Sequence, residues 1–216
     1  GELGQLVMIG GMGADTLRVF GAHADATLVG DNVDMGLSVD GARRYVTSLL
    51  LDQGAADQIQ TTNGDFVILG GIGGDVLRAG SGHGLVLGDS GSLVYDASGD
   101  GTLRYITSLG LSQGGNDQIT LGSEGADQGY NTWVIGGQGM DEIGVLSVRG
   151  TADNFVERGI AGDNARFAFD PQGRLIDFET LDSDIATAGD DSIRLVMSGN
   201  VLSADPLNDL NVVAGG

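Results

Sequence analysis

The chain has no cysteine, no lysine, only two histidines and two prolines, and aromatic residues make up only 5% of its 216 residues. Without cysteine it has no disulfides or thiolate metal ligands, and its histidines are too few for an ordinary zinc or copper site. The shortage of large side chains argues against a conventional globular core. It favours narrow stacked coils, which need small residues and aliphatic ladders.

Positive charge is also scarce, because thirty acidic residues face ten arginines and give a formal net charge of −20. Such a charge disfavours nucleic acid and anionic membranes as partners. No stretch approaches the ~20 consecutive apolar residues of a membrane-spanning helix. The acidic residues either form an ordinary solvated surface or are partly neutralised by bound cations; their recurrence in turns favours the second interpretation.

What is abundant is glycine, with 40 residues, and a glycine-aspartate phrase that recurs along the chain. It reads VMIGGMGADTL from Val7, VILGGIGGDVL from Val67, WVIGGQGMDEI from Trp133 and VVAGG from Val212. The Gly-Gly pairs begin at 10, 70, 136 and 215, so the spacings are 60, 66 and 79 residues. We therefore expect one array over 1–216, with repeats at about 7–66, 67–132 and 133–211 and the start of another at 212–216.

Each phrase carries the groups that bind a hard cation. Glycines adopt positive φ and can turn carbonyl groups inward, and the aspartate adds a carboxylate. Calcium takes six to eight oxygen ligands in irregular geometry, which such turns can supply. The predicted calcium-binding residues of the phrases are Gly11, Gly13, Asp15, Gly71, Gly73, Asp75, Gly137, Gly139 and Asp141.

The phrases GGMGAD, GGIGGD and GGQGMD, each followed by x-Leu or x-Ile, resemble the GGxGxDxUx nonapeptide of the RTX (repeats-in-toxin, haemolysin-type) calcium-binding proteins. This resemblance implies an all-β fold, a right-handed parallel β-roll or β-solenoid with calcium ions between successive turns. It also implies a chain that stays unfolded without calcium and folds on export.

The phrases do not follow one another directly, because alternating apolar segments around short turns lie between them. LSVDGARRYVTSLLL from Leu37, SLVYDASGDGTLRYITSLGL from Ser92 and ARFAFDPQGRLIDFETL from Ala165 predict protruding β-hairpin insertions. One repeat is then about two coils plus one hairpin. This layout places further predicted calcium ligands on the edge of the phrases: Asp31, Asp89 and Asp163 before the hairpins, and Asp57, Asp117 and Asp191 after them.

On the opposite edge the motif is degenerate, with His23, Gly84 and Phe66 at positions where the motif has glycine or aspartate. We expect that edge to be held by packing and hydrogen bonds alone. His23 and His83 are predicted to face solvent, and Trp133 to be a strand residue equivalent to Val7 and Val67. The recurring Arg44-Tyr45 and Arg104-Tyr105 pairs either form a solvated cross-strand face or contact a carbohydrate or a neighbouring chain.

Other interpretations remain open, because aspartate in a Gly-Asp turn often only bonds to nearby backbone N–H groups. A glycosidase or polyuronate lyase also needs just two suitably spaced acids. The acids recur at equivalent positions, so we expect no enzyme but a calcium-binding structural segment of a large secreted or cell-surface bacterial protein, such as an adhesin stalk or fibre. The alternative is the secretion and folding module of an RTX-type exoenzyme or toxin. The expected partners are calcium ions and neighbouring repeats or copies placed end to end.

Overall fold

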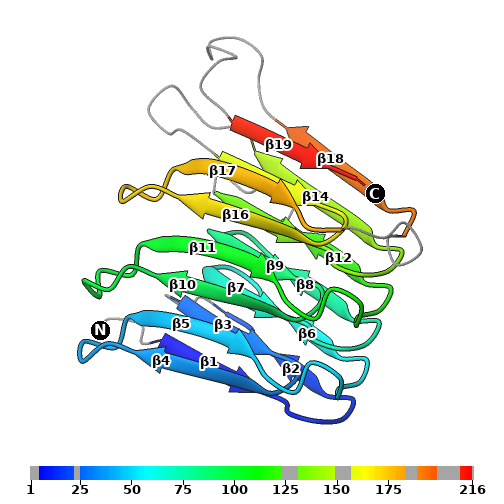
Figure 1. Cartoon of the computed structure of the whole chain (residues 1–216), viewed down its shortest axis with the longest axis horizontal. Helices are drawn as coiled ribbons and strands as arrows, with labels where there is room; N and C mark the ends of the chain where they lie inside the picture. The colour runs from blue at the N-terminus through cyan, green and yellow to red at the C-terminus, as the bar shows by residue number, and fades with distance from the viewer. Residues whose placement is uncertain are drawn as a thin grey trace.

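The computed structural model describes residues 5–21, 25–122, 131–148, 157–182, 189–198 and 210–215. Within these ranges the chain forms strands β1 to β19 and no helix, and the strands belong to three sheets (Figure 1). The part of the chain so described therefore contains no helix with the length and apolarity needed to cross a membrane.

The first sheet, called the middle sheet, is parallel and has the strand order β1-β3-β7-β9-β13-β15-β19. Its strands are β1 (Gln5–Ile9), β3 (Asp25–Val29), β7 (Asp65–Leu69), β9 (Gly84–Leu87), β13 (Thr132–Ile135), β15 (Glu157–Ala161) and β19 (Leu210–Ala214).

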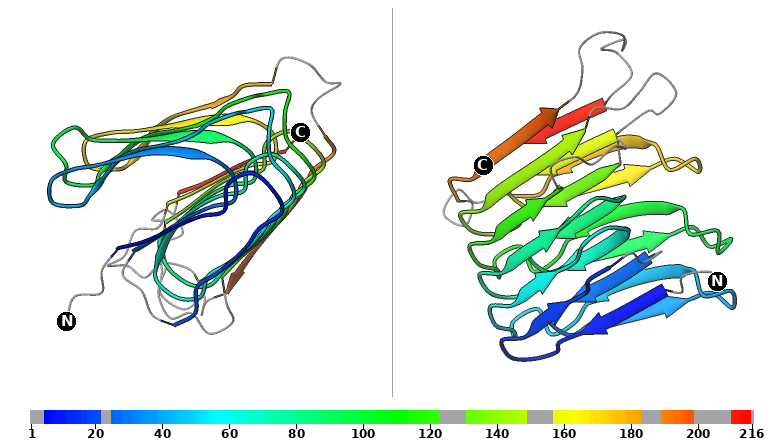
Figure 2. Two further views of the ribbon diagram at one scale, coloured as in Figure 1. Left: turned by 90° about the horizontal axis from the view of Figure 1, so that it is seen from below. Right: turned by 180° about the vertical axis from the view of Figure 1, so that it is seen from behind.

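The second, called the outer sheet, is also parallel, with the order β2-β6-β8-β12-β14-β18. Its strands are β2 (Thr16–Arg18), β6 (Gln58–Gln60), β8 (Val76–Ala79), β12 (Gln118–Leu121), β14 (Glu142–Val148) and β18 (Ser192–Ser198). The chain alternates between these two sheets, and one middle-sheet strand followed by one outer-sheet strand is called a circuit here. The end-on view in Figure 2 shows the circuits stacked on one another.

The space between the two parallel sheets is filled by ladders of aliphatic side chains. Leu28 pairs in register with Ile68 and Ile68 with Val86, all fully buried in the middle sheet. The outer sheet faces them with Leu17, Ile59, Leu77, Ile119 and Ile143. Identical backbone spacing in each circuit places equivalent side chains one strand apart, at ~4.8 Å, so aliphatic residues stack without gaps.

The hairpins form the third sheet, called the hairpin sheet. They are β4 (Val33–Leu37) with β5 (Arg43–Ser48), β10 (Gly91–Tyr95) with β11 (Leu103–Ser108), and β16 (Ala165–Phe169) with β17 (Leu175–Thr180). The sequence predicts protruding hairpins, but the structure differs. Neighbouring hairpins pair antiparallel, β5 with β10 and β11 with β16, and make one sheet of six strands.

This hairpin sheet covers the second face of the middle sheet, which explains why strands β7, β9 and β13 are buried on both faces. Val46, Leu93, Ile106 and Phe167 of the hairpins pack against the middle sheet in a second hydrophobic core. A hairpin with one apolar face gains more by covering a sheet than by standing free in water. The molecule therefore has three layers around two cores.

Trp133 lies in a strand, as predicted, and also belongs to this second core. It pairs with Leu85 in the middle sheet, and its ring meets Phe169 edge-on with centroids 4.8 Å apart. Glycine at 159 makes room, because a Cβ there would lie 2.8 Å from the ring of Phe167 and 2.9 Å from that of Trp133.

Candidate functional site: an edge of stacked aspartates

Every circuit turns from the middle sheet to the outer sheet through the same kind of position. A glycine directly follows the middle-sheet strand, and an aspartate directly precedes the outer-sheet strand. In the GGxGxD turns the second and third glycines have positive φ, as the sequence predicts: Gly11 96°, Gly13 118°, Gly71 111°, Gly73 127°, Gly137 118° and Gly139 136°. A residue with a side chain rarely adopts these angles, so glycine is required here.

The three hairpins are inserted in this same turn, in alternate circuits. The inserted segments begin after Gly30, Gly88 and Gly162, and they end before Asp57, Asp117 and Asp191. Long and short connections thus bring their aspartates into one column, here called the carboxylate edge. The column runs through Asp15, Asp57, Asp75, Asp117, Asp141 and Asp191.

Hydrogen bonds join the column from circuit to circuit. In each step the backbone N–H of one aspartate donates to Oδ1 of the aspartate in the next circuit. The N···O distances are 2.6 Å from Asp15 to Asp57, 2.6 Å from Asp57 to Asp75, 2.7 Å from Asp75 to Asp117, 2.8 Å from Asp117 to Asp141 and 2.9 Å from Asp141 to Asp191.

In the middle of the column the second carboxylate oxygen has no such partner. Asp57, Asp75, Asp117 and Asp141 are at most 2% exposed. Their Oδ2 atoms are buried without a hydrogen-bond partner. A buried carboxylate oxygen that has lost its water and gained no donor is costly.

These spare oxygens lie beside backbone carbonyls of the adjacent circuit. A Cβ placed on Gly70 would lie 2.1 Å from the carbonyl oxygen of Gly88 and 2.3 Å from Oδ2 of Asp75. Similar pairs of oxygens surround the turn glycines in other circuits: Gly10, Gly30, Gly88 and Gly136. The edge therefore presents carbonyl and carboxylate oxygens together, around positions that exclude any side chain.

A second row of aspartates, Asp31, Asp89 and Asp163, is also buried at the roots of the hairpins. Asp31 and Asp89 each reach the turn of the following circuit. Asp31 accepts the N–H of Ile72 through Oδ2 at 2.6 Å, and Asp89 accepts those of Gln138 at 2.5 Å and Gly115 at 3.1 Å. Ile72 and Gln138 are the third residues of GGIGGD and GGQGMD, so this row ties the hairpins to the phrases.

Crowding and burial raise the pKa values of buried aspartates at this edge. Burial, with neighbouring carboxylates adding to it, raises the pKa of Asp57 to about 6, of Asp75 to about 8, and of Asp141 to about 7. The same causes raise the pKa of Asp163 to about 6 and the pKa values of Asp31, Asp89 and Asp117 above the ordinary range. The ionised edge is thus unfavourable unless a cation compensates its charge.

The predicted calcium ligands of the phrases and those beside the hairpins therefore lie on one edge, as the layout of the repeats predicts. Within the described ranges, however, no three His, Cys, Asp or Glu side chains converge into a metal-binding group. A circuit contributes one carboxylate to this edge, or two where a hairpin is inserted, so carbonyl oxygens would have to complete any site. Buried, unpartnered Oδ2 atoms beside such carbonyls fit a hard, oxygen-preferring cation and not a soft one.

The opposite edge carries a second ladder; hydrogen bonds are expected there, but the sequence does not predict which residues make them. There, Asp65 Oδ1 accepts the N–H of His83 at 2.9 Å, His83 Nδ1 accepts that of Asn131 at 3.2 Å, and Asn131 Oδ1 accepts that of Glu157 at 2.9 Å. We call these residues the polar edge. His83 is exposed, in agreement with the prediction, whereas His23 lies outside the described residues. No motif could have revealed this ladder, because its members are 18, 48 and 26 residues apart.

No protein-family model matches the chain, and the comparisons with curated proteins and with solved structures found no similar protein. The arrangement of its own residues therefore carries the functional argument.

Proposed function

We propose that the chain is a calcium-binding structural segment of a large secreted or cell-surface protein, folded as a right-handed β-roll with hairpin insertions. The observation that supports this most is the row of buried Oδ2 atoms without donors in the consecutive circuits of Asp57, Asp75, Asp117 and Asp141. Calcium supplies positive charge there and accepts carbonyl and carboxylate oxygens together. The carboxylate edge would hold the ions, while the apolar ladders and the three sheets would form a rigid spacer.

Electrostatics makes the proposed ions part of the fold. Ionised carboxylates ~4.8 Å apart repel by about 1 kcal/mol in bulk water and by several at the effective dielectric of a protein surface. Folded domains are stable by only ~5–15 kcal/mol, so a column of such pairs removes much of the margin. Ions that bind only the folded state restore it, each by ~2.7 kcal/mol at a hundredfold excess over Kd.

Circular dichroism of the chain in chelator, followed by titration with calcium, tests the proposal. We expect little β-sheet signal in chelator and a cooperative gain on titration, with magnesium much less effective because it demands smaller, regular octahedral sites. A fully formed β spectrum in chelator, with the same melting temperature after calcium is added, would contradict the proposal.

We also propose that further repeats or copies extend the array end to end. At one end of the sheets, Val7 and Ile9 of β1 are 38% and 48% exposed, whereas Val67 and Leu69 at the same register in β7 are buried. A further circuit would cover these side chains and pair the backbone of β1. Sedimentation of the calcium-loaded chain should show concentration-dependent association, which V7D and I9D together should abolish. Strict monomers at high concentration would contradict self-association.

A further inference from the structure

The hairpin sheet packs on the middle sheet with one face and turns its other face away from both cores (Figure 1). Two rows of side chains cross this outer face in register from strand to strand. The first row contains Gly36, Tyr45, Val94, Tyr105, Ala168 and Asp177. The second row contains Asp34, Thr47, Ser92, Thr107, Arg166 and Glu179. The two rows are two residues apart along each strand, so both lie on the same face, ~7 Å apart.

The middle of the first row is an exposed strip of Tyr45, Val94 and Tyr105, which includes both tyrosines of the recurring Arg-Tyr pairs. Val94 and Tyr105 are each 40% exposed, whereas Leu93 and Ile106 on the inner face are at most 1% exposed. Neighbouring strands are ~4.8 Å apart, so the strands of the two tyrosines are separated by ~9.6 Å. The strip therefore offers two aromatic rings with an aliphatic side chain between them.

Contacts on either side of the strip hold both rings in place. The ring of Tyr45 lies over Gly36, where an added Cβ would collide with it, and its hydroxyl donates to Asp34 Oδ1 at 3.4 Å. The guanidinium of Arg166, on the next hairpin, lies 5.1 Å from the centre of the Tyr105 ring. Side chains that are positioned before binding lose little conformational freedom when a ligand packs on them.

The second row supplies hydrogen-bonding groups beside the strip. Thr47 Oγ1 and Ser92 Oγ form a hydrogen bond of 2.8 Å, and Thr107 continues the row on the next strand. A hydroxyl group can both donate and accept, so a row of hydroxyls can match the hydroxyl groups of a ligand in more than one orientation.

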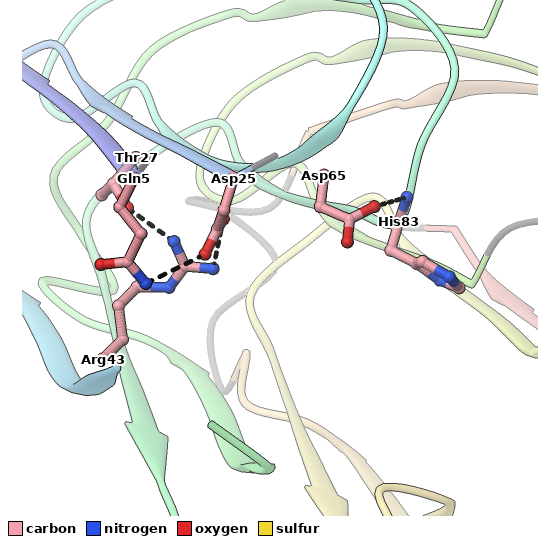
Figure 3. Close-up of polar contacts among 6 residues, drawn as sticks. All are labelled: Gln5, Asp25, Thr27, Arg43, Asp65 and His83. Carbon is pink, nitrogen blue, oxygen red and sulfur yellow. Dashed lines mark hydrogen bonds and ion pairs between the residues drawn. The ribbon is translucent and has the colours of Figure 1, made fainter. Parts of the chain in front are cut away.

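Of the two adjacent arginines in the first hairpin, Arg43 turns away from this face. Each hairpin has a register shift near its turn, and Arg43 occupies the position where the other hairpins have Leu103 and Leu175. Its guanidinium donates to Asp25 Oδ1 at 2.7 Å and to Thr27 Oγ1 at 2.9 Å in the middle sheet (Figure 3). The charge of Arg43 is therefore compensated beneath the hairpin sheet and does not reach the strip.

The charges that remain on the outer face are largely paired. Arg166 lies 3.8 Å from Glu179, and Arg104 lies 3.8 Å from Asp96, while Arg44 adds a single exposed cation. A charged ligand finds no cluster of opposite charge here, and an anion is also repelled by the net charge of −20. Charge complementarity thus favours an uncharged partner.

The backbone of this face limits the partner further. Strands β5, β10 and β11 each have a neighbouring strand on both sides, so a peptide cannot add to them as a further strand. Recognition has to use the two rows of side chains. An extended chain of sugar residues matches both rows, because its C–H faces can pack on aromatic rings while its hydroxyl groups bond to those of the second row.

We propose that the outer face of the hairpin sheet binds an extended, neutral glycan that crosses strands β5, β10 and β11. Its sugar rings stack on Tyr45 and Tyr105, and its hydroxyl groups bond to the second row. The third hairpin has Asp177 at the position of these tyrosines, so the strip ends there. Binding needs only the folded sheet and does not depend on which ions occupy the carboxylate edge. It would add a recognition role to a segment otherwise proposed as a spacer.

Calorimetry and affinity electrophoresis on the folded chain in calcium test this with chains that differ in charge and length. The neutral probes are cellohexaose, xylohexaose and the hexamer of N-acetylglucosamine, each with its disaccharide, and hexagalacturonate is the anionic probe. We expect at least one neutral hexasaccharide to bind, and to bind more tightly than its disaccharide, because only the longer chain reaches both rings. Hexagalacturonate should not bind.

Substitutions at the two rings test where the glycan lies. Y45A and Y105A should each weaken binding of the neutral hexasaccharide about fivefold, and Y105F should retain most of the affinity that Y105A loses. The control I176A removes a side chain that is 66% exposed on the same sheet but away from the strip, and it should change nothing.

A gain of binding is expected where the strip can be lengthened. D177Y places a ring at the equivalent position of the third hairpin, two strands or ~9.6 Å beyond Tyr105. It should strengthen binding of the neutral hexasaccharide about fivefold, because the same chain then reaches a third ring.

Several outcomes would overturn the proposal. They are no binding of any neutral hexasaccharide, tighter binding of hexagalacturonate, binding that Y45A and Y105A leave unchanged, and no gain from D177Y. Circular dichroism and the melting temperature of each variant in calcium separate these outcomes from loss of the fold, and so from failure of the proposed calcium function.

Discussion

The two edges of the coiled part use the same hydrogen bond with different residues. At the carboxylate edge, the acceptor for the neighbouring circuit's N–H is aspartate at every step from Asp57 to Asp191. At the polar edge the same task is done by Asp65, His83 and Asn131 in turn. At the first edge, Asp57, Asp75, Asp117 and Asp141 are buried and have raised pKa values. At the second, His83 is exposed and the other two acceptors are half-buried.

This contrast separates what a ladder needs from what the aspartates add. Any short side chain with an acceptor atom can accept the backbone N–H of the neighbouring circuit, as the histidine and asparagine at the polar edge demonstrate. The uniform aspartates at the other edge are therefore not explained by the ladder bond. What they add is a second oxygen and a negative charge in every circuit, and both are unfavourable when buried alone. A counter-ion is the simplest physical reason for keeping them.

The largest expected effect comes from making the carboxylate edge resemble the polar edge. Replacing Asp57, Asp75 and Asp117 by asparagine keeps each Oδ1 acceptor and removes four like-charge contacts along the ladder. At ~1 kcal/mol or more for each contact, the metal-free fold should gain at least ~4 kcal/mol. The gain should appear as a β-sheet signal in chelator, measured by circular dichroism above the raised pKa values, where the unsubstituted chain shows little.

The triple variant should also lose most of its response to calcium, whereas D65N at the polar edge should keep it. If the variant remains unfolded in chelator and still folds on adding calcium, charge repulsion is not what the ions relieve.

The next largest effect is expected from filling the space between carbonyl and carboxylate oxygens beside a turn glycine. G70A introduces a Cβ that would lie 2.1 Å from the Gly88 carbonyl oxygen. Because both atoms belong to rigid backbone, we expect a loss of about 3 kcal/mol or more. G41A, at a hairpin turn with φ of 87° and no atom within 4 Å, should lose only ~1–2 kcal/mol through its backbone angle. Equal losses in urea melts would show that the turn is not tightly packed.

The pH dependence of the metal-free stability should be a smaller, graded effect with a definite sign. The folded-state pKa values of Asp57, Asp75 and Asp141 are raised to about 6, 8 and 7, above the ~3.9 of an unfolded aspartate. The folded state therefore binds protons more tightly, so metal-free stability is greatest below the unfolded pKa and falls as pH rises through these values.

In chelator, the chain should accordingly gain β-sheet signal, and its melting temperature should then rise, as the solution is acidified from above pH 8 towards pH 4. Saturating calcium should remove or reverse this slope. A metal-free melting temperature that falls on acidification would contradict the burial of these carboxyls.

The smallest effect is expected at the polar edge. H83N keeps the acceptor for Asn131 N–H, and the side chain is exposed, so the free energy of unfolding should change by less than ~0.5 kcal/mol. H83A removes the acceptor and should lose ~1 kcal/mol. A large loss in H83N alone would show that the imidazole has a structural role beyond the ladder.

Local patterns in the sequence were sufficient for much of the fold. The phrase glycines have the predicted positive φ. The hairpins also lie where alternating apolar residues flank a turn. The nine predicted aspartates share one edge because six directly precede an outer-sheet strand and three follow the glycine at the end of a middle-sheet strand. Both are local relations repeated in register.

The remaining features depend on contacts between distant segments. Nothing around Val46 or Leu93 indicates that their strands pair across 45 residues, Thr47 bonding to Ser92. The polar ladder likewise depends on the register between circuits of unequal length. Arg43 in the place of Leu103 can be recognised only once the hairpins are aligned by their register shifts.

The hairpin sheet sets a rule for how such a chain can change length. A hairpin is two strands wide, ~9.6 Å, which is the height of two circuits of the parallel sheets. The hairpins can pair with one another only because they arise from alternate circuits. The number of residues between Gly-Gly pairs varies from 60 to 79, because the loops differ in length. The height of one unit, two circuits with one hairpin, cannot vary. Deleting a single circuit would put two hairpins at one level, so the array should gain or lose material only as whole two-circuit units.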